Sequence, residues 1–233
     1  MSKRAIILAG GKGTRLKPYS ISLPKPLVPI GDKPILEIII KQLSKSGFNH
    51  ITITVNHLAD IIKAFFNNGE RWGVKIDYSL EETSLNTMGP LSLIKDLPED
   101  FLIMNGDVLT DLNFSEFYSF HTKNQNIFTV STYQRIQKSE YGVIQFNKDS
   151  HKMIGFQEKP ESKYMVSMGV YMANKQILDL IPYNKPYGFD TLMHDLLHNE
   201  TPAQIRPHNG YWLDIGRPDD YEKAIEDIEK LKI

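Results

Sequence analysis

Hydrophobic and polar residues alternate between two patterns in the first half of the chain. Short, continuous apolar runs predict buried strands at 4–9, 50–56, 74–80 and 101–107. Between these runs, apolar residues recur at helical spacing and predict helices at 34–48, 58–69 and 89–97. Strands and helices that alternate in this way indicate a largely parallel sheet with helices on both faces.

The second half of the chain contains more strands and fewer helices. Its apolar runs predict strands at 127–133, 141–146, 152–159 and 165–172. Its helical patterns cover 188–199 and 218–231. Because no stretch has the composition of a linker, we expect a single domain over 1–233, with a nucleotide-binding half (1–112) and an elaborated second half (113–233).

The composition excludes several classes of protein. The 233 residues carry a net charge of −1, which predicts no bulk attraction to nucleic acid or to a membrane surface. The chain has no cysteine, so a disulfide framework and a thiolate zinc site are excluded. No segment approaches the about 20 apolar residues that span a bilayer, and no signal peptide is apparent. We therefore expect a cytoplasmic protein.

The loop after the first strand indicates an anion site. Gly10, Gly11 and Gly13 can turn backbone N–H groups toward a phosphate. The spacing matches neither the Walker loop nor the dinucleotide fingerprint, and the glycines alone fit a solvated turn equally well. Arg15 adds a planar fork for phosphate, and Lys25 is held between two prolines, which restrict the backbone on both sides.

These residues also carry a resemblance. The segments "LAGGKGTRLKP" and "PKPLVPIGDKPI", together with "WLDIGRPDDY" near the C-terminus, resemble the signature of the sugar-1-phosphate nucleotidyltransferases. The resemblance implies an enzyme that makes an NDP-sugar and pyrophosphate from an NTP and a sugar-1-phosphate. It also implies a Rossmann-like, GT-A-type, three-layer α/β sandwich with a mixed, mostly parallel central sheet. Homo-oligomers are possible.

The resemblance assigns residues to the nucleotide and to a metal. The catalytic residues would be Arg15, Lys25 and Asp107. Asp107 and Asp214 would hold Mg²⁺, a hard cation that prefers oxygen ligands. The nucleotide-binding residues would be Leu8, Ala9, Gly10, Gly11, Gly13, Thr14, Arg15, Glu81, Thr87 and Gly89.

The second half would bind the sugar phosphate. Its predicted contacts are Gly142, Glu158, Lys159 and Gly169, with Glu158 reading sugar hydroxyls and Lys159 pairing with the phosphate. The family usually has Asn-x-Gly where this chain has Ser167-Met168-Gly169, so the sequence does not predict an asparagine contact to the sugar.

Glu81 indicates which nucleotide base the protein binds. A carboxylate only accepts hydrogen bonds, and guanine presents two adjacent donors, so Glu81 favours GTP. Mannose-1-phosphate guanylyltransferases look similar in this loop, which favours a mannose- or heptose-type sugar and a role in making cell-surface polysaccharide precursors. The alternative is a uridylyl-, thymidylyl- or cytidylyltransferase acting on glucose-1-phosphate or an amino-sugar-1-phosphate.

Two other classes remain open. A sugar-nucleotide sensor could keep the fold without the reaction, but it would not need both metal ligands. A metal-dependent glycosyltransferase usually carries Asp-x-Asp, whereas this chain reads "NGDVLTD" at the end of the strand. Release of pyrophosphate distinguishes the nucleotidyltransferase from both.

Overall fold

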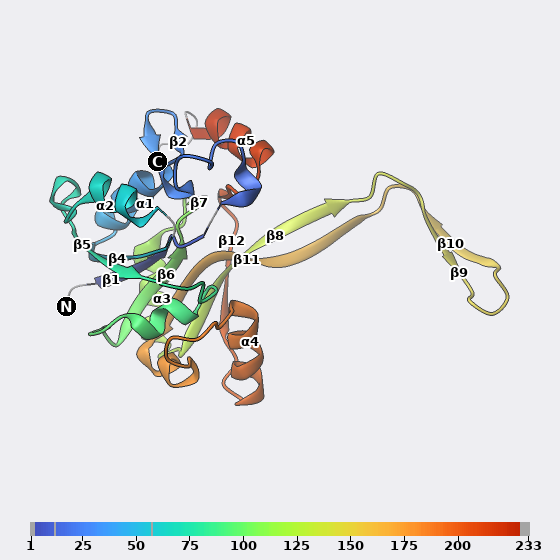
Figure 1. Ribbon diagram of the computed structural model, residues 1–233. Helices are drawn as coiled ribbons and strands as arrows, with labels where there is room; N and C mark the ends of the chain where they lie inside the picture. Colours follow the sequence, from blue (N-terminus) through green and yellow to red (C-terminus); the bar gives the residue numbers. More distant parts are fainter. Residues whose placement is uncertain (1–2, 12, 57, 229–233) are drawn as a thin grey trace.

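A mixed seven-stranded sheet forms the centre of the protein (Figure 1). The computed structural model describes residues 3–11, 13–56 and 58–228. Four of the six neighbouring pairs in the sheet are parallel, which confirms the expected mostly parallel sheet. In order across the sheet, the strands are β12 (Gln204–His208), β8 (Phe128–Lys138), β11 (Glu161–Asn174), β6 (Asp100–Asn105), β1 (Lys3–Leu8), β4 (Phe48–Val55) and β5 (Lys75–Leu80).

Helices cover both faces of this sheet because its central strands are apolar on both sides. On β1, Ala5 and Ile7 face one buried cluster and Ile6 faces the other. One face is covered by α1 (Ile35–Lys45), α2 (Ala59–Phe66), α3 (Phe114–Lys123) and α5 (Pro218–Ile228). The other is covered by α4 (Phe189–His198) and by the 3-10 turns η4 (Gly89–Leu93) and η5 (Lys175–Leu180).

Two short strand pairs lie outside the main sheet near the predicted site. The chain between β1 and α1 forms the 3-10 turns η1 (Thr14–Leu16) and η2 (Lys25–Leu27), then β2 (Pro29–Ile30) and β3 (Lys33–Pro34). Near the end of β6, β7 (Val108–Thr110) pairs with β13 (Trp212–Asp214). This pairing joins segments about a hundred residues apart. A further 3-10 turn, η3 (Glu70–Trp72), precedes β5.

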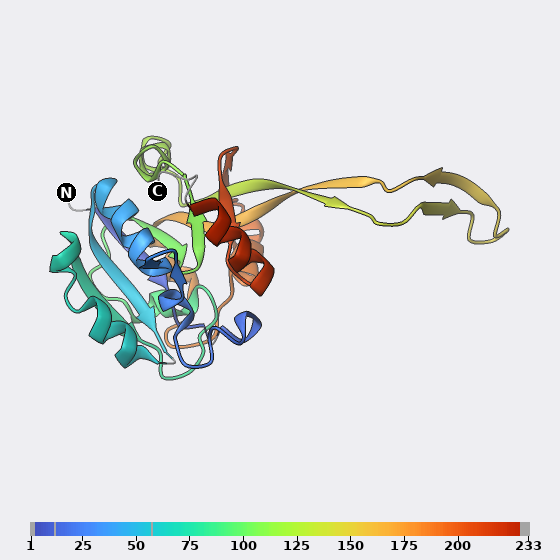
Figure 2. The ribbon, with the colours of Figure 1, turned by 90° about the horizontal axis from the view of Figure 1, so that it is seen from above.

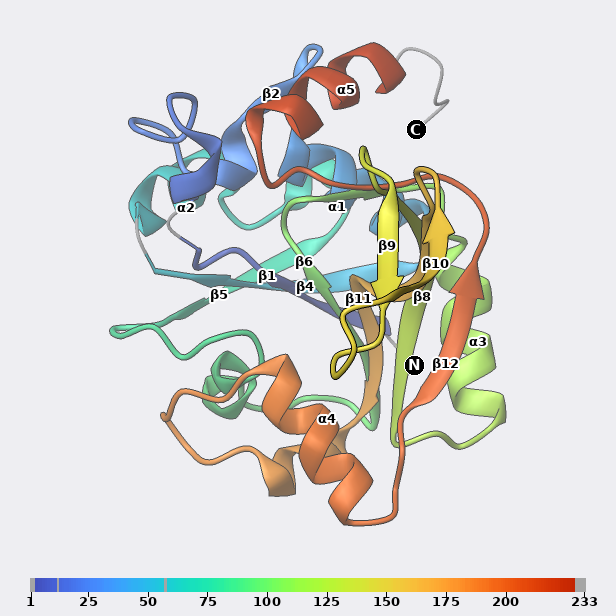
Figure 3. The same ribbon diagram turned by 90° about the vertical axis from the view of Figure 1, so that its right-hand side faces the viewer.

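A long two-stranded arm projects from the body (Figures 1 and 2). It begins where β8 and β11 leave the sheet, and it ends in a separate pair, β9 (Val143–Phe146) and β10 (Met153–Gln157). Burial falls along β8 from fully buried residues to exposed ones. Figure 3 looks along the arm and shows β9 and β10 in front of the sheet.

The structure differs from the sequence expectations in several places. Within 89–97 only Gly89–Leu93 is helical, as the 3-10 turn η4, because the backbone becomes extended at Ile94. The helix α3 and the strand β12 were not predicted. The strands β9 and β10 pair only with each other among the described residues. The predicted helix 218–231 is present as α5 (Pro218–Ile228) over its described residues, and 229–231 lie outside them.

The helices are short relative to a bilayer. Within the described residues, none is long and apolar enough to cross a membrane.

Candidate active site

The predicted site gathers where β1 and β6 reach their carboxyl ends, the usual place for ligands in an open α/β sheet. Gly10, Gly11 and Gly13 follow β1, and Asp107 follows β6. The two loops touch, since the N–H of Gly106 donates to the carbonyl of Leu8 at 2.9 Å. A Cβ on Gly106 would lie 3.1 Å from that same oxygen, so glycine permits the contact.

The glycine loop folds against the proline-rich segment. Gly13 has φ +61°, and a Cβ there would lie 3.1 Å from the Cβ atoms of Lys25 and Ser20. The hydroxyl of Ser20 donates to the carbonyl of Gly13 at 2.6 Å. Gly11 faces open space, with no atom within 4 Å of a Cβ placed on it. The contacts of Gly13 with Ser20 and Lys25 therefore fix the loop, and Gly11 stays open to a ligand. Lys12 lies outside the described residues.

Four predicted charged residues meet beside this loop. Lys25 forms an ion pair with Asp107, although the two are 82 positions apart. Burial raises the pKa of Asp214, and the nearby Asp107 carboxylate raises it further. Lys25 and Arg15 act in the opposite direction on that pKa. A cavity of about 280 Å³ opens beside three of them; it is lined by Gly11, Gly13, Thr14, Arg15, Lys25, Asp107 and Gly216.

The pairing of β7 with β13 brings the two aspartates together. Asp214 lies opposite Val108, and the N–H of Ile215 donates to the carbonyl of Asp107 at 3.0 Å. One oxygen of Asp107, Oδ1, is buried and has no hydrogen-bond partner among the described residues. An unpartnered buried carboxylate oxygen is costly unless something binds it.

This carboxylate pair fits a divalent cation. Within the described residues, no group of three or more His, Cys, Asp or Glu side chains could hold a metal. A cation here would take its other ligands from water and from substrate phosphates, which is the coordination that Mg²⁺ favours.

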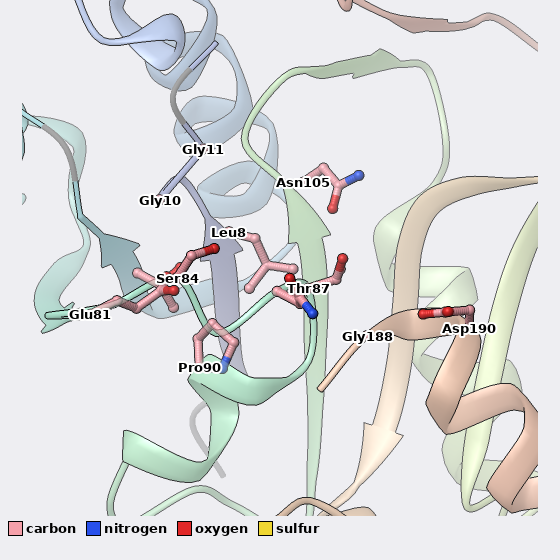
Figure 4. A pocket seen from close by; sticks show the side chains of 12 residues that line it. Leu8, Gly10, Gly11, Glu81, Ser84, Thr87, Pro90, Asn105, Gly188 and Asp190 are labelled. Carbon is pink, nitrogen blue, oxygen red and sulfur yellow. The ribbon is translucent and has the colours of Figure 1, made fainter. Parts of the chain in front are cut away.

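A second cavity of about 480 Å³ continues from the glycine loop (Figure 4). It is lined by Leu8, Gly10, Gly11, Thr54, Glu81, Ser84, Asn86, Thr87, Pro90, Asn105, Gly188 and Asp190. Glu81 is only 6% exposed, and burial raises the pKa of its carboxyl group. One of its oxygens accepts a 3.3 Å hydrogen bond from the N–H of Leu85. A Cβ on Gly10 would lie 2.5 Å from the other, so Glu81 lies directly against the glycine loop.

The loop that carries Thr87 is fixed by its backbone. Asn86 occupies the left-handed region, with φ 61°, a conformation that asparagine tolerates better than most residues. The N–H groups of Met88 and Gly89 both donate to the carbonyl of Tyr187 at 2.9 Å. Gly89 therefore packs this loop onto the chain before α4 rather than lining the cavity. Ala9 is also buried, with its N–H bonded to Thr54.

A third cavity, of about 280 Å³, lies beside Asp214 and contains Gly169. Gly169 has φ +72°, and a Cβ there would lie 2.5 Å from Nδ2 of Asn105. Ser167, which replaces the family's asparagine, donates from its hydroxyl to the Tyr171 hydroxyl at 3.0 Å. Trp212 closes another side and donates from Nε1 to the Met168 carbonyl at 2.9 Å.

The other three predicted sugar-phosphate residues lie on the arm. A Cβ on Gly142 would lie 3.0 Å from Oε2 of Glu158, so these two residues are close. Lys159 follows Glu158 with φ 42°, in the left-handed region. The structure does not bring these residues together with Asp107 and Asp214, because β8 and β11 carry them away from the body (Figure 1).

Sequence reasoning missed several lining residues. Asn105 borders both the second and third cavities, Trp212 borders the third, and Asp190 borders the second. Asn105 and Trp212 stand two positions before Asp107 and Asp214, so their strand ends were a usable signal. No pattern around Asp190 pointed to it.

An open α/β sheet with a glycine loop and an adjacent cavity at its carboxyl edge is the arrangement typical of nucleotide-binding α/β proteins. More specifically, the chain belongs to the nucleotidyl transferase family, whose model matches residues 4–231. The resemblance expected from the sequence is confirmed.

Curated relatives carry more than one specificity. The UTP–glucose-1-phosphate uridylyltransferase of Synechocystis is 33% identical, over 99% of this chain and 64% of the relative. The catalytic subunit beta of mannose-1-phosphate guanylyltransferase from Dictyostelium discoideum is 32% identical, over 94% of this chain and 62% of the relative. The chain thus spans slightly less than two thirds of the length of these relatives.

Solved structures share the fold. HddC from Yersinia pseudotuberculosis, complexed with GMP-PN, is 27% identical with a TM-score of 0.74, covering 97% of this chain and 99% of that one. A glucose-1-phosphate thymidylyltransferase structure from Bacillus anthracis, itself described as putative, has a TM-score of 0.80 at 19% identity, covering 100% of this chain and 97% of that one. At that identity it shows the fold alone.

Proposed function

We propose that this chain is a sugar-1-phosphate nucleotidyltransferase, which converts an NTP and a sugar-1-phosphate into an NDP-sugar and pyrophosphate. The observation that carries the proposal is the meeting of Lys25, Arg15, Asp107 and Asp214 beside the glycine loop. Family membership over nearly the whole chain supports it. A sensor would have no use for an unpartnered buried carboxylate oxygen on Asp107.

The reaction needs no covalent intermediate on the protein. A phosphate oxygen of the sugar-1-phosphate forms a bond to the α-phosphorus of the NTP. The bond from that phosphorus to the bridging oxygen breaks, and pyrophosphate leaves with the electron pair. Arg15 and Lys25 would neutralise charge that develops on the phosphates, and the N–H groups near Gly11 would orient them.

Mg²⁺ fits the carboxylate pair. When bound, a divalent cation would supply electrostatic stabilisation of the phosphates. Asp107 and Asp214 would hold it, and the ion pair with Lys25 would orient the Asp107 carboxylate.

The nucleotide we favour is GTP, with a mannose- or heptose-type sugar phosphate. Glu81 lies in the cavity against the glycine loop, where its carboxylate could accept from the N1–H and N2–H₂ groups of guanine. The guanylyltransferase relatives and the GMP-PN complex of HddC agree with this choice. The uridylyltransferase relative keeps UTP as the alternative.

A pyrophosphate-release screen tests the reaction. Five NTPs are assayed against a panel of sugar-1-phosphates with Mg²⁺, with and without EDTA. We expect release only with a matched pair, loss with EDTA, and recovery with excess Mg²⁺. No release with any pair would contradict the proposal.

Two variants sharpen the screen. Asp107→Asn removes a metal ligand at constant volume, so it should abolish turnover without unfolding the protein. Asp60→Asn, an exposed carboxylate on α2, is the matched control and should keep full activity. An active Asp107→Asn enzyme would remove this residue from the metal site.

A third variant tests the base. Glu81→Gln exchanges an acceptor for a group that both donates and accepts, so the preference should move from GTP toward UTP or dTTP in a competition assay. Glu82→Gln is the control, because Glu82 is exposed. An unchanged preference in the Glu81 variant contradicts the role of Glu81 in choosing the base.

A further inference from the structure

The end of the arm is apolar and exposed. Tyr141 is 78% exposed and Ile154 is 70% exposed. Val143 and Ile144 are neighbours on one strand and therefore point to opposite faces, yet both are exposed. A two-stranded hairpin is marginally stable in water unless something packs on it. Among the described residues nothing packs on it, so another surface is needed to cover both faces.

The arm also carries positively charged side chains that the sugar-phosphate cavity of the body lacks. Gly142, Glu158 and Lys159, the proposed sugar-phosphate contacts, lie between the β8–β11 ladder and the terminal pair of β9 and β10. The N–H of Ser139 donates to the carbonyl of Pro160 at 3.0 Å and closes the hairpin beside Lys159. Lys159 is held in the left-handed region, a conformation that costs free energy and is typical of functional positions. The third cavity of the body, beside Asp214, has no lysine or arginine among its lining residues.

The arm does not reach its own cavity. Seven successive residue pairs join β8 to β11, from Ser167 opposite Thr132 to Glu161 opposite Lys138. At about 3.3 Å per residue, this ladder puts Glu161 about 20 Å beyond Ser167, which lines the cavity. Glu158 lies three residues further out.

The root of the arm is fixed to the body. The rings of Tyr133 and Trp212 lie 5.3 Å apart, and Trp212 is bonded to the backbone of Met168. Folding the arm back onto its own cavity would break these contacts or the ladder. A second copy of the chain could place an arm there without breaking either.

Charge and shape favour a second copy as the occupant. Residues 133–167 carry six Lys or Arg against four Asp or Glu, whereas the remainder carries 21 against 24. The arm and the body therefore have net charges of opposite sign. A groove of about 670 Å³ between the arm root and α5 opens beside Asp214 and offers an approach for the end of a partner's arm.

We propose that two copies of this chain exchange arms, so that the arm of each copy completes the sugar-phosphate cavity of the other. The proposal rests on the proposed function for the roles of Glu158 and Lys159. In a two-fold symmetric dimer, each copy inserts its own arm into the partner's cavity and receives the partner's arm in its own cavity. It buries the apolar residues of both arms and brings Lys159 to a cavity that has no cation of its own.

Mixed dimers test the exchange. Asp107→Asn chains have an intact arm and an inactive body, and Lys159→Ala chains have the reverse. Each variant alone should lose at least about 10²-fold in kcat/KM, as expected when a group that stabilises the reacting phosphates is lost. Co-expressed with two different affinity tags and purified through both, the pair should regain about half of the wild-type activity, since one of two symmetric sites is intact.

The outcomes are distinct. An inactive mixed dimer, or failure to recover any doubly tagged protein, overturns the exchange. A fully active Lys159→Ala enzyme overturns the role of the arm. A wild-type protein that releases no pyrophosphate overturns the proposed function instead, and the mass measurement below then still tests the dimer.

Solution mass gives the independent measurement. The wild-type protein should have about twice the chain mass of 26.7 kDa. Ile154→Asp, on the end of the arm, should shift it to the monomer and raise KM for the sugar phosphate about 10-fold or more, leaving nucleotide binding unchanged. Ile61→Asp, at a 38% exposed position on α2, is the matched control and should remain dimeric. A wild-type monomer contradicts the proposal.

Discussion

At the residue scale, the site depends on how Lys25 is held. Pro24 and Pro26 fix the backbone around it, and the contact with Gly13 sets its position against the glycine loop. Its ammonium then meets the carboxylate of Asp107. A flexible surface lysine would lose side-chain entropy to reach the same place, whereas this one is largely positioned by its backbone.

Replacing this lysine should affect catalysis more than binding. Lys25→Ala should lower kcat by about 10²–10³-fold, because it removes a charge that acts on the reacting phosphates. Steady-state kinetics measure the change, with Lys95→Ala, an exposed lysine outside the site, as the control. A normal kcat in Lys25→Ala would place this residue outside the chemistry.

Because Glu81 is buried, we also expect the free energy of unfolding to depend on its protonation. Since burial raises its pKa in the folded protein, the ionised form destabilises the fold. The contribution of Glu81 to stability is present below the pKa of an unfolded glutamate, about 4.3, and is lost as the pH rises through the higher folded value. Glu81→Gln should therefore unfold at higher urea than the wild type at neutral pH.

The comparison across pH is the check. The difference in free energy of unfolding between Glu81→Gln and the wild type should shrink as the pH falls toward about 4.3. There Glu81 becomes protonated in both the folded and the unfolded wild-type protein. The exposed Glu82→Gln control should show no such pattern. An advantage that does not change with pH would mean that burial of the charge is not its cause.

At the element scale, two short strands that the sequence did not predict position the aspartates of the site. The three-residue strands β7 and β13 bring Asp107 and Asp214 together, although neither strand is long enough to show a pattern in the sequence. Helix α3 follows β7 directly. It begins at an asparagine cap: the side chain of Asn113 accepts from the N–H of Glu116 at 3.1 Å. The reciprocal contact, from Asn113 Nδ2 to the Glu116 carboxylate, measures 2.9 Å.

Loss of this cap should cost a measurable amount of stability. Asn113→Ala should lower the free energy of unfolding by about 1 kcal/mol, because it leaves a helix N–H without its partner. Urea unfolding measures the difference. Ser119→Ala is the control on the same helix: its hydroxyl bonds to the Ser115 carbonyl within the helix, so its loss should have little effect. Equal effects in the two variants would contradict a capping role.

At the scale of the whole molecule, the body and the arm have different kinds of stability. Both buried clusters are built without any residue between 133 and 167. The arm therefore adds little to the core, and its own stability depends on what covers it.

Removing the arm tests this division. Replacing 139–160 with an Asn-Gly turn should leave one cooperative unfolding transition at nearly the wild-type temperature. Nucleotide should still protect the truncated protein against unfolding, but turnover with a sugar phosphate should be lost. A truncated protein that fails to fold would show that the arm belongs to the core.

The sequence anticipated most of the central elements and the charged residues near Asp107. Apolar runs such as 4–9 and 101–107 predicted β1 and β6 well, because strands buried on both faces leave a continuous apolar pattern. It missed β12, whose segment is polar, and α3, although Phe114, Phe117 and His121 are buried there at helical spacing. It also missed Asn105, although its place at the end of β6 was a usable signal, and Asp190, which no sequence pattern marks. The division of the chain at residue 112 stays a prediction.

The sequence by itself determined which local structures form and which chemical groups are available: glycines that bare the backbone, a lysine between prolines, and carboxylates at strand ends. These depend on neighbours in the chain, so short-range patterns carry them. Only the tertiary structure decided which groups meet. Asp107 and Asp214 come together through a strand pairing about a hundred residues apart, and Glu158 and Lys159 lie far from both because a paired ladder carries them outward. Long-range pairing is decided by packing of the whole chain, which no local pattern records.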